Sequence, residues 1–255
     1  MRYITLGQDD KELSEIVLGM MRIKDKSVKE VEELVETALS VGINAFDLAD
    51  IYGRGRCEEL LGLVLKNRPD ALMESDQVAE AFDLLYKQGK VRDFGVSNQN
   101  PMMMELLKKD VKQPLAVNQL QLSAAFTPGF ESAFHVNMED SQAAMRDGSI
   151  FEYCKLHDVV IQAWSVLQFG YFKGNFVGNE KFQALNQVLD RLAIKYGVTS
   201  STIAISWILR YPAKMQAVVG TTNPKHLREV SRAANFSLTR KEWYEIYLAA
   251  GNNLP

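Results

Sequence analysis

The sequence predicts one α/β domain of 255 residues, in which a parallel β-sheet is covered by helices. Two observations support this fold class. Short apolar runs alternate with amphipathic helical patterns along most of the chain, and this alternation is typical of parallel sheets. The composition is 47% hydrophobic and 24% charged, as in globular proteins with one large core. No low-complexity tract or linker rich in Pro, Gly and Ser divides the chain, so residues 1–255 are expected to form a single domain.

The first unit of this alternation is a strand, a helix and a second strand. The first strand is predicted over 15–23, and Ser27 is the expected N-cap of the helix that follows. Glu30, three residues later, would complete a capping box, and Gly42 is positioned to end the helix. The apolar run 43–50 is then predicted as the second strand.

The same pattern continues through the rest of the chain. Helices are predicted over 75–90, 101–110, 149–158, 181–197 and 200–212, and strands over 91–98, 115–122, 159–167 and 217–223.

Polar side chains gather where the predicted strands end. In a (β/α) barrel the reactive rim is the carboxyl end of the strands, so separate turns would deliver these groups to one mouth. The stretch 123–149 has no clear period and is long for a connection, and it is predicted to be a loop over this mouth. The clustered residues are Asp47 and Tyr52, Ser97 and Asn98, Asn118 and Gln119, Trp164 and Ser165, and the run from Gly220 to Asn223.

Charge and hydropathy exclude several classes of partner. The formal net charge is −3 and the charges are spread along the chain, which argues against nucleic-acid binding and against a polybasic membrane patch. The first residues are too charged for a secretory signal, and the longest charge-free stretch is too polar to span a bilayer. We expect a cytoplasmic protein that acts on a small molecule. Cys57 and Cys154 lack metal-ligand spacing and are predicted to be reduced structural thiols.

Five blocks of the sequence resemble the aldo/keto reductase family, in the order in which that family has them, and particularly its bacterial oxidoreductase branch. They are GINAFDLADIYG, GKVRDFGVSN, NQLQ, IQAWSVL and VVGTTNPKHLREV. The resemblance runs through most of the chain. It implies a (β/α)8 TIM-barrel fold and an oxidoreductase that uses NADP(H) on a small-molecule carbonyl or alcohol.

The resemblance also implies roles for individual residues. Tyr52 would donate a proton to the substrate carbonyl, and Asp47 would be the buried carboxylate of the catalytic set. Trp164 would stack on the nicotinamide ring. Further cofactor contacts would come from Ser97, Asn98 and Gln119 at the nicotinamide carboxamide, and from Ser165 and Leu167 at the pyrophosphate.

The last of the five blocks has a physical logic of its own. Asn223 followed by Pro224 is typical of an N-cap and a first helical residue, which would leave backbone N–H groups for an anion. Lys225, His226 and Arg228 add positive charge in the same turn, and this favours the 2′-phosphate of NADP(H) over NAD(H). The arginine expected for that phosphate is replaced by His226. The neighbouring residues of this anion site would be Gly220, Thr221 and Thr222.

Half of the family's catalytic tetrad has no counterpart in the sequence. The tetrad needs a lysine at the end of the third barrel strand and a histidine at the end of the fourth. A strand–helix–strand unit takes about 30 residues or more, and none fits between Lys66 and Ser75. Asn67 stands at the position of the histidine. We therefore expect an incomplete barrel of about six strands without the third and fourth, with a homodimer as one way of filling the gap.

Two alternatives remain open at this point. Residues 60–67 could form the fourth strand, which would leave seven strands but still no lysine.

On function, the first candidate is a reductase of impaired activity. Without the lysine no cation lowers the pKa of Tyr52, while the adjacent Asp47 raises it. The second is an inactive nucleotide-binding remnant with a regulatory or interaction role.

Overall fold

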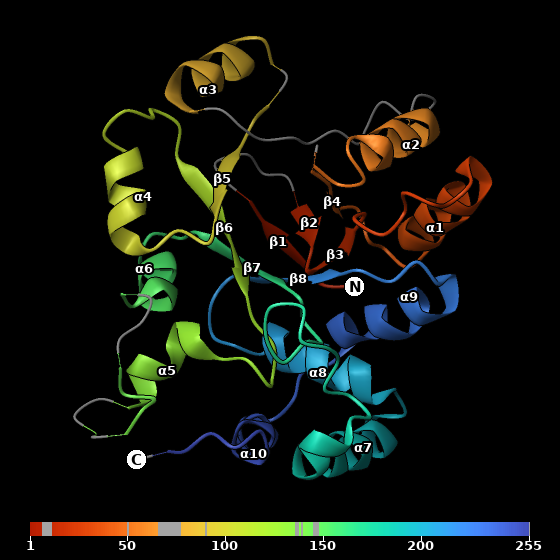
Figure 1. Ribbon diagram of the computed structural model, residues 1–255, viewed down its shortest axis with the longest axis vertical. Helices are drawn as coiled ribbons and strands as arrows, with labels where there is room; N and C mark the ends of the chain where they lie inside the picture. The colour runs from red at the N-terminus through yellow and green to blue at the C-terminus, as the bar shows by residue number, and fades with distance from the viewer. Residues whose placement is uncertain are drawn as a thin grey trace.

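The computed structural model describes residues 1–6, 12–49, 51–65, 78–89, 91–135, 138, 140–144 and 148–254. Within them, six strands form one parallel sheet in the order β4-β3-β8-β7-β6-β5, and helices surround it (Figure 1). The fold is therefore α/β and of the barrel type. The strands are β3 (Ile16–Gly19), β4 (Phe46–Asp47), β5 (Phe94–Ser97), β6 (Leu115–Gln121), β7 (Val160–Trp164) and β8 (Met215–Val219).

The sheet is open between β4 and β5, its two edge strands. In an eight-stranded barrel the third and fourth strands stand between the second, here β4, and the fifth, here β5. The described residues supply neither, which confirms the predicted incomplete barrel. A fourth strand over 60–67 is wrong for residues 60–65, because these are helical in α2 (Arg56–Leu65). Residues 66 and 67 lie outside the described part of the chain.

Helices fill the connections between the strands, and a short antiparallel hairpin, β1 (Tyr3–Thr5) and β2 (Glu12–Ser14), precedes the barrel. No single helix among the described residues is long and apolar enough to span a membrane. One pair of helical segments, Glu180–Tyr196 and Ser200–Leu209, has the required length and composition when taken together, but it is bent by 93° at the break between the two segments. The other helices are α1 (Val28–Ser40), α3 (Val78–Lys87), α4 (Pro101–Leu107), α5 (Pro128–Phe134), α6 (Ile150–Leu156), α7 (Gln183–Tyr196), α8 (Ser200–Leu209), α9 (Pro224–Ser231) and α10 (Arg240–Ala249), with 3₁₀ turns η1 (Glu180–Phe182) and η2 (Arg232–Asn235).

Helix α1 shows how local sequence sets an element. The side chain of Ser27 accepts from the backbone N–H of Glu30 at 3.3 Å, and the Glu30 carboxylate accepts from the backbone N–H of Ser27 at 2.8 Å. This is the predicted capping box, and it satisfies two donors that the first turn would otherwise leave open. Gly42 follows the helix with φ +86°, a conformation that glycine adopts without strain.

Two predictions about the chain need correction. The stretch 123–149 was expected to be a loop, but it contains helix α5, whose Phe130 is fully buried against Trp207 of α8 and Tyr247 of α10. The predicted second strand, 43–50, is reduced to the two residues of β4, which pairs with β3 alone among the described strands. The prediction for the cysteines is confirmed, because both are free and buried.

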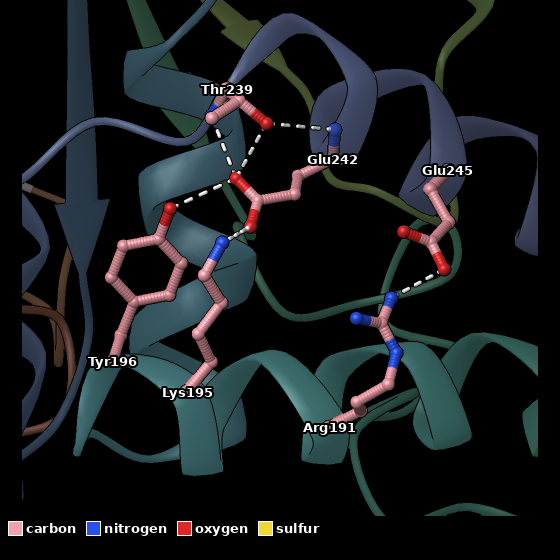
Figure 2. Close-up of polar contacts among 6 residues, drawn as sticks. All are labelled: Arg191, Lys195, Tyr196, Thr239, Glu242 and Glu245. Carbon is pink, nitrogen blue, oxygen red and sulfur yellow. Dashed lines mark hydrogen bonds and ion pairs between the residues drawn. The ribbon is translucent and has the colours of Figure 1, made fainter.

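A cluster of hydrogen bonds and ion pairs connects helix α10 to helix α7 (Figure 2). The carboxylate of Glu242, only 6% exposed, accepts from Lys195 Nζ at 2.6 Å and from Tyr196 Oη at 2.9 Å. It also accepts from the backbone N–H and the hydroxyl of Thr239, at 2.8 and 2.7 Å. Burial raises the pKa of Glu242, but the hydrogen bonds from Lys195, Thr239 and Tyr196 outweigh it and hold that pKa at about 2.

Candidate active site

The polar residues predicted to meet lie along one rim of the sheet, at the carboxyl ends of its strands, with the exception of Asn118. The Asn118 side chain is fully buried and donates to the Gln99 carbonyl at 2.8 Å, so its inclusion in the predicted cluster was wrong. Asp47 ends β4, Ser97 ends β5 and Trp164 ends β7. The register of the sheet places Ser97 opposite Gln119 of β6. Gly220 directly follows β8. The rim of this open barrel therefore brings together side chains from segments that are far apart in the sequence.

Asp47 and Tyr52 face each other at the open side of this rim. Tyr52 Oη donates to Asp47 Oδ2 over a long 3.5 Å contact. Burial raises the pKa of the Asp47 carboxyl, opposed by the hydrogen bonds from Gln119 and Tyr52. Burial and the neighbouring Asp47 raise the pKa of Tyr52 to about 12, which confirms the predicted direction. Among the described residues no basic side chain bonds to either group, so Tyr52 is a neutral phenol at physiological pH.

Gln119 is a neutral hydrogen-bond donor to Asp47, which the described residues give no basic partner. Its Nε2 donates to Asp47 Oδ1 at 2.8 Å and to Gln162 Oε1 at 2.6 Å. The sequence pattern did not predict these contacts, and it missed Gln162 and Gln216 entirely. A signal for both was present, since each is a polar residue inside an otherwise apolar strand.

Ser97, Asn98 and Trp164 lie together next to Gln119. Ser97 Oγ donates to the Gln119 carbonyl oxygen at 3.2 Å, and Trp164 Nε1 donates to Asn98 Oδ1 at 3.3 Å. Asn98 has φ +52°, a left-handed conformation that asparagine tolerates better than most residues. The exposed ring of Tyr171 packs edge-on against Trp164, with centroids 6.0 Å apart, and this neighbour was not predicted from the sequence.

The two residues predicted at the pyrophosphate lie in the turn after β7. Ser165 has φ +54°, and its hydroxyl donates to Gln168 Oε1 at 3.4 Å. Leu167 is partly buried against the main core, so its side chain serves packing as well. Any contact with a pyrophosphate would therefore come from the backbone and the Ser165 hydroxyl.

The start of α9 confirms the predicted cap but offers fewer free donors than expected. Asn223 Oδ1 accepts from the backbone N–H of Lys225 at 2.9 Å, Pro224 has no N–H, and Leu227 N already donates to the Asn223 carbonyl. The backbone N–H of His226 is the donor left for an anion. A side chain at Gly220 would meet no atom within 4 Å, so a ligand has room to approach the backbone there.

Three basic residues follow in this turn, and they do not all face the same way. Lys225 and His226 are exposed and carry no described ion pair. Arg228 instead donates to Thr37 Oγ1 of α1 at 3.3 Å, which directs its guanidinium toward the neighbouring helix. Thr221 Oγ1 accepts from the backbone N–H of Asn223 at 3.2 Å, and Thr222 is half-buried in the same turn.

The residues present fit a dinucleotide. The rim offers hydrogen-bonding amides beside a half-buried indole, and the turn after β8 offers open backbone, a free N–H and two exposed basic side chains. The described residues contain no group of His, Cys, Asp and Glu side chains that could hold a metal ion. Asn67, at the expected position of the tetrad histidine, lies outside the described residues.

Comparison with known proteins agrees with this arrangement. The family model "Aldo/keto reductase family" matches the chain in two pieces, residues 15–75 and 67–249. The chain is 27% identical over 306 aligned residues to a 6-dehydroglucose reductase of Agrobacterium fabrum, covering 95% of this chain and 96% of the relative. It is 26% identical over 314 residues to the oxidoreductase YdhF of Escherichia coli, covering 99% of each. Both alignments are longer than this chain of 255 residues, so both relatives contain positions that it lacks.

Solved structures share the fold. The thermostable aldo-keto reductase Tm1743, in complex with the inhibitor epalrestat, superposes with a TM-score of 0.75 at 23% identity, over 98% of this chain and 100% of that one. An aldo-keto reductase of Klebsiella pneumoniae in complex with NADPH gives a TM-score of 0.74 at 17% identity, over 96% and 93%. The two pieces of the family match overlap at residues 67–75, where the sequence predicts that a strand–helix–strand unit is absent.

Proposed function

Since this chain belongs to the aldo/keto reductase family, we propose that it is an oxidoreductase that reduces small-molecule carbonyls with NADPH at a rate limited by an incomplete catalytic set. The observation that carries this proposal is the Asp47–Tyr52 pair beside Gln119, on the rim that also holds Asn98 and Trp164. NADPH, when bound, supplies the hydride. NAD(H) is the less favoured dinucleotide, because the turn after β8 carries exposed positive charge suited to a 2′-phosphate.

Different residues of the rim would contact different parts of the cofactor. Trp164 would stack on the nicotinamide, and its bond to Asn98 fixes the plane of the indole. Lys225 and His226 would face the 2′-phosphate, whereas Arg228 would first have to leave Thr37. The other contacts would come from Ser97, Asn98 and Gln119 at the carboxamide, Ser165 and Leu167 at the pyrophosphate, and Gly220, Thr221, Thr222 and Asn223 beside the adenosine phosphates.

Tyr52 would hold the proton that a carbonyl oxygen takes up on reduction. With its pKa raised to about 12, the phenol keeps that proton at neutral pH, so it can orient a carbonyl by hydrogen bonding. The same high pKa makes it a poor acid, because no cation among the described residues stabilises the phenolate that transfer would leave. Positioning would thus account for more of the rate than acid catalysis.

The alternative proposal is an inactive nucleotide-binding protein with a regulatory or interaction role. The raised pKa of Tyr52 and the neutral partner of Asp47 favour it, since neither arrangement assists proton transfer. Both proposals require cofactor binding and differ in turnover. NADPH oxidation with a broad panel of aldehydes, ketones and quinones separates them.

Binding of NADP⁺ is expected to quench the fluorescence of Trp164 with a micromolar or tighter Kd. Trp164 is the half-buried indole at the rim, whereas Trp207 and Trp243 are buried in the core, 1% and 6% exposed. The matched control is Trp164→Phe, which should abolish most of the quenching and leave the core signal. Absence of both saturable quenching and thermal stabilisation by NADP⁺ would rule out the cofactor site.

Asp47→Asn is expected to raise the free energy of unfolding by about 1 kcal/mol at pH 7. Burial raises the folded pKa of Asp47 above its unfolded value, so its protonated form is favoured in the fold. The stabilisation by protonation is complete below the unfolded pKa and is lost as pH rises through the folded pKa. Urea unfolding at pH 7 and at pH 3.5 tests this, because the advantage of the variant should be present only at pH 7. A loss of stability at pH 7 would contradict it.

We also propose that two copies associate across the open side. In the described part of the chain β4 and β5 each lack a second neighbour, and unpaired edges in native proteins are covered or paired. Apolar side chains are exposed on α3 and α4, the helices that precede and follow the edge strand β5 in the chain, with Leu84 and Tyr86 of α3 at 56% and 55% and Leu106 of α4 at 57%. Light scattering is expected to give twice the 28.8 kDa of one chain. A monomer at high micromolar concentration would exclude the dimer.

A further inference from the structure

A chain of side-chain amides crosses three neighbouring strands and ends on Asp47. Gln119 of β6 lies in register with Gln162 of β7, and Gln162 with Gln216 of β8. Gln119 Nε2 donates to Gln162 Oε1 at 2.6 Å, and Gln162 Nε2 donates to Gln216 Oε1 at 2.9 Å. Gln216 Nε2 donates to the backbone carbonyl of Ser14 at 2.9 Å. The other end of the chain is the 2.8 Å bond from Gln119 Nε2 to Asp47 Oδ1.

The direction of every hydrogen bond in this amide chain follows from its end at the backbone carbonyl of Ser14. A backbone carbonyl can only accept, so Gln216 must turn its nitrogen toward Ser14 and its oxygen toward Gln162. Gln162 must then present its nitrogen to Gln216 and its oxygen to Gln119. Gln216 is 1% exposed, so water cannot replace its partners, and a flipped Gln216 amide would leave its oxygen facing the Ser14 carbonyl oxygen.

Gln119 therefore has one allowed orientation. Both hydrogens on its Nε2 are committed, one to Gln162 and one to Asp47, and its Oε1 is the atom left to face a ligand. An oxygen in that place accepts a hydrogen bond and cannot donate one. A bound nicotinamide would accordingly have to present the NH₂ side of its carboxamide to Gln119.

We propose that Gln162 and Gln216 are positioning residues of the cofactor site, which hold the Gln119 amide with its nitrogen toward Asp47 and its oxygen toward the carboxamide of the nicotinamide. This inference rests on the proposed function and extends it to two residues outside the site. The amide chain selects dinucleotides whose ring carries an N–H donor. It also gives Asp47 a neutral hydrogen-bond donor, where the described residues supply no cation.

The test compares NADP⁺ with its 3-acetylpyridine analogue. In the analogue a methyl ketone replaces the carboxamide, so the substituent on the pyridine ring has no N–H. The parent is expected to bind NADP⁺ about tenfold more tightly than the analogue, as the loss of one hydrogen bond to the Gln119 oxygen implies. The Asp47 carboxylate can only accept and also orients Gln119, so the variants are made in an Asp47→Asn background, where the amide chain alone sets the Gln119 orientation. Asp47→Asn itself should keep the ratio near ten. Adding Gln162→Met or Gln216→Met frees the Gln119 amide to flip, and the ratio should then fall to about two or less. A role in packing alone would weaken both dinucleotides equally and leave the ratio unchanged.

Two controls keep the comparison interpretable. Gln113→Met removes a hydrogen-bonded glutamine just before the amino end of β6, where Gln113 donates to Asp83 at 2.7 Å, and the ratio should stay near the parent value. Gln162 is only half-buried, so Gln162→Met should fold even if Gln216→Met does not. A parent ratio near one, or a ratio near ten in Asp47→Asn combined with Gln162→Met, would overturn this inference alone. A parent that binds neither dinucleotide would overturn the proposed function and this inference with it.

Discussion

Tyr52→Phe is expected to change the rate of single-turnover NADPH oxidation by less than about tenfold, and the parent itself is expected to react about 10²–10⁴ more slowly than a full-length relative. General acid–base assistance typically supplies that factor, and it depends on a donor whose pKa lies near the working pH. Burial and Asp47 raise the pKa of Tyr52 to about 12, and no basic side chain among the described residues lowers it. Removing the hydroxyl therefore removes little acid catalysis.

The reference for this experiment is the Escherichia coli oxidoreductase YdhF, assayed with the same panel of aldehydes, ketones and quinones. Single-turnover conditions isolate the chemical step from product release. A parent rate close to that of YdhF, collapsing in Tyr52→Phe, would show that the catalytic set is complete and that a basic group outside the described residues lowers the pKa of Tyr52.

Glu242→Gln is expected to lower the free energy of unfolding by about 2–3 kcal/mol at pH 7. The folded pKa of Glu242 is about 2, below the unfolded value of about 4.3, because bonds from Lys195, Thr239 and Tyr196 outweigh its burial. The stabilisation by its charge is complete above the unfolded pKa and is lost as pH falls from there toward 2. The gap between parent and variant should therefore narrow below pH 4.

Urea unfolding at several pH values measures this effect, and the chain offers a matched control next to it. Glu245 pairs with Arg191 on the same two helices, but the two side chains are 38% and 54% exposed (Figure 2). Glu245→Gln should cost less than about 0.5 kcal/mol, as exposed ion pairs contribute little. Equal free energies of unfolding for the parent and Glu242→Gln at pH 7 would show that the buried Glu242 charge does not stabilise the contact between α7 and α10.

Much of the fold could be predicted from local chemistry. The capping box at Ser27 and Glu30, and the cap formed by Asn223 ahead of Pro224, depend on residues three or fewer positions apart. All residues that form such a cap lie close together in the sequence, so the sequence alone is enough to predict it. The open barrel could also be predicted, because a strand–helix–strand unit needs a minimum length that the sequence between Lys66 and Ser75 does not have.

Other features could not be predicted, because they depend on tertiary neighbours. The length of β4 reflects pairing on one side with β3, and helix α5 is held by aromatic contacts to α8 and α10 rather than by an apolar period of its own. The bond from Gln119 to Asp47 joins side chains 72 residues apart and arises only once both strands share a rim. The roles of individual residues at the cofactor stay predictions.

The pH dependence of single-turnover NADPH oxidation between pH 5 and pH 9 shows whether Tyr52 reacts as an unassisted, neutral phenol. A phenol with its pKa raised to about 12 keeps its proton throughout this range, so the rate should not fall as pH rises toward 9. The slope above pH 7 should also be the same in the parent and in Tyr52→Phe. A fall in the parent rate with an apparent pKa between 7 and 9, absent from Tyr52→Phe, would mean that Tyr52 has a cationic partner and that its catalytic set is not incomplete.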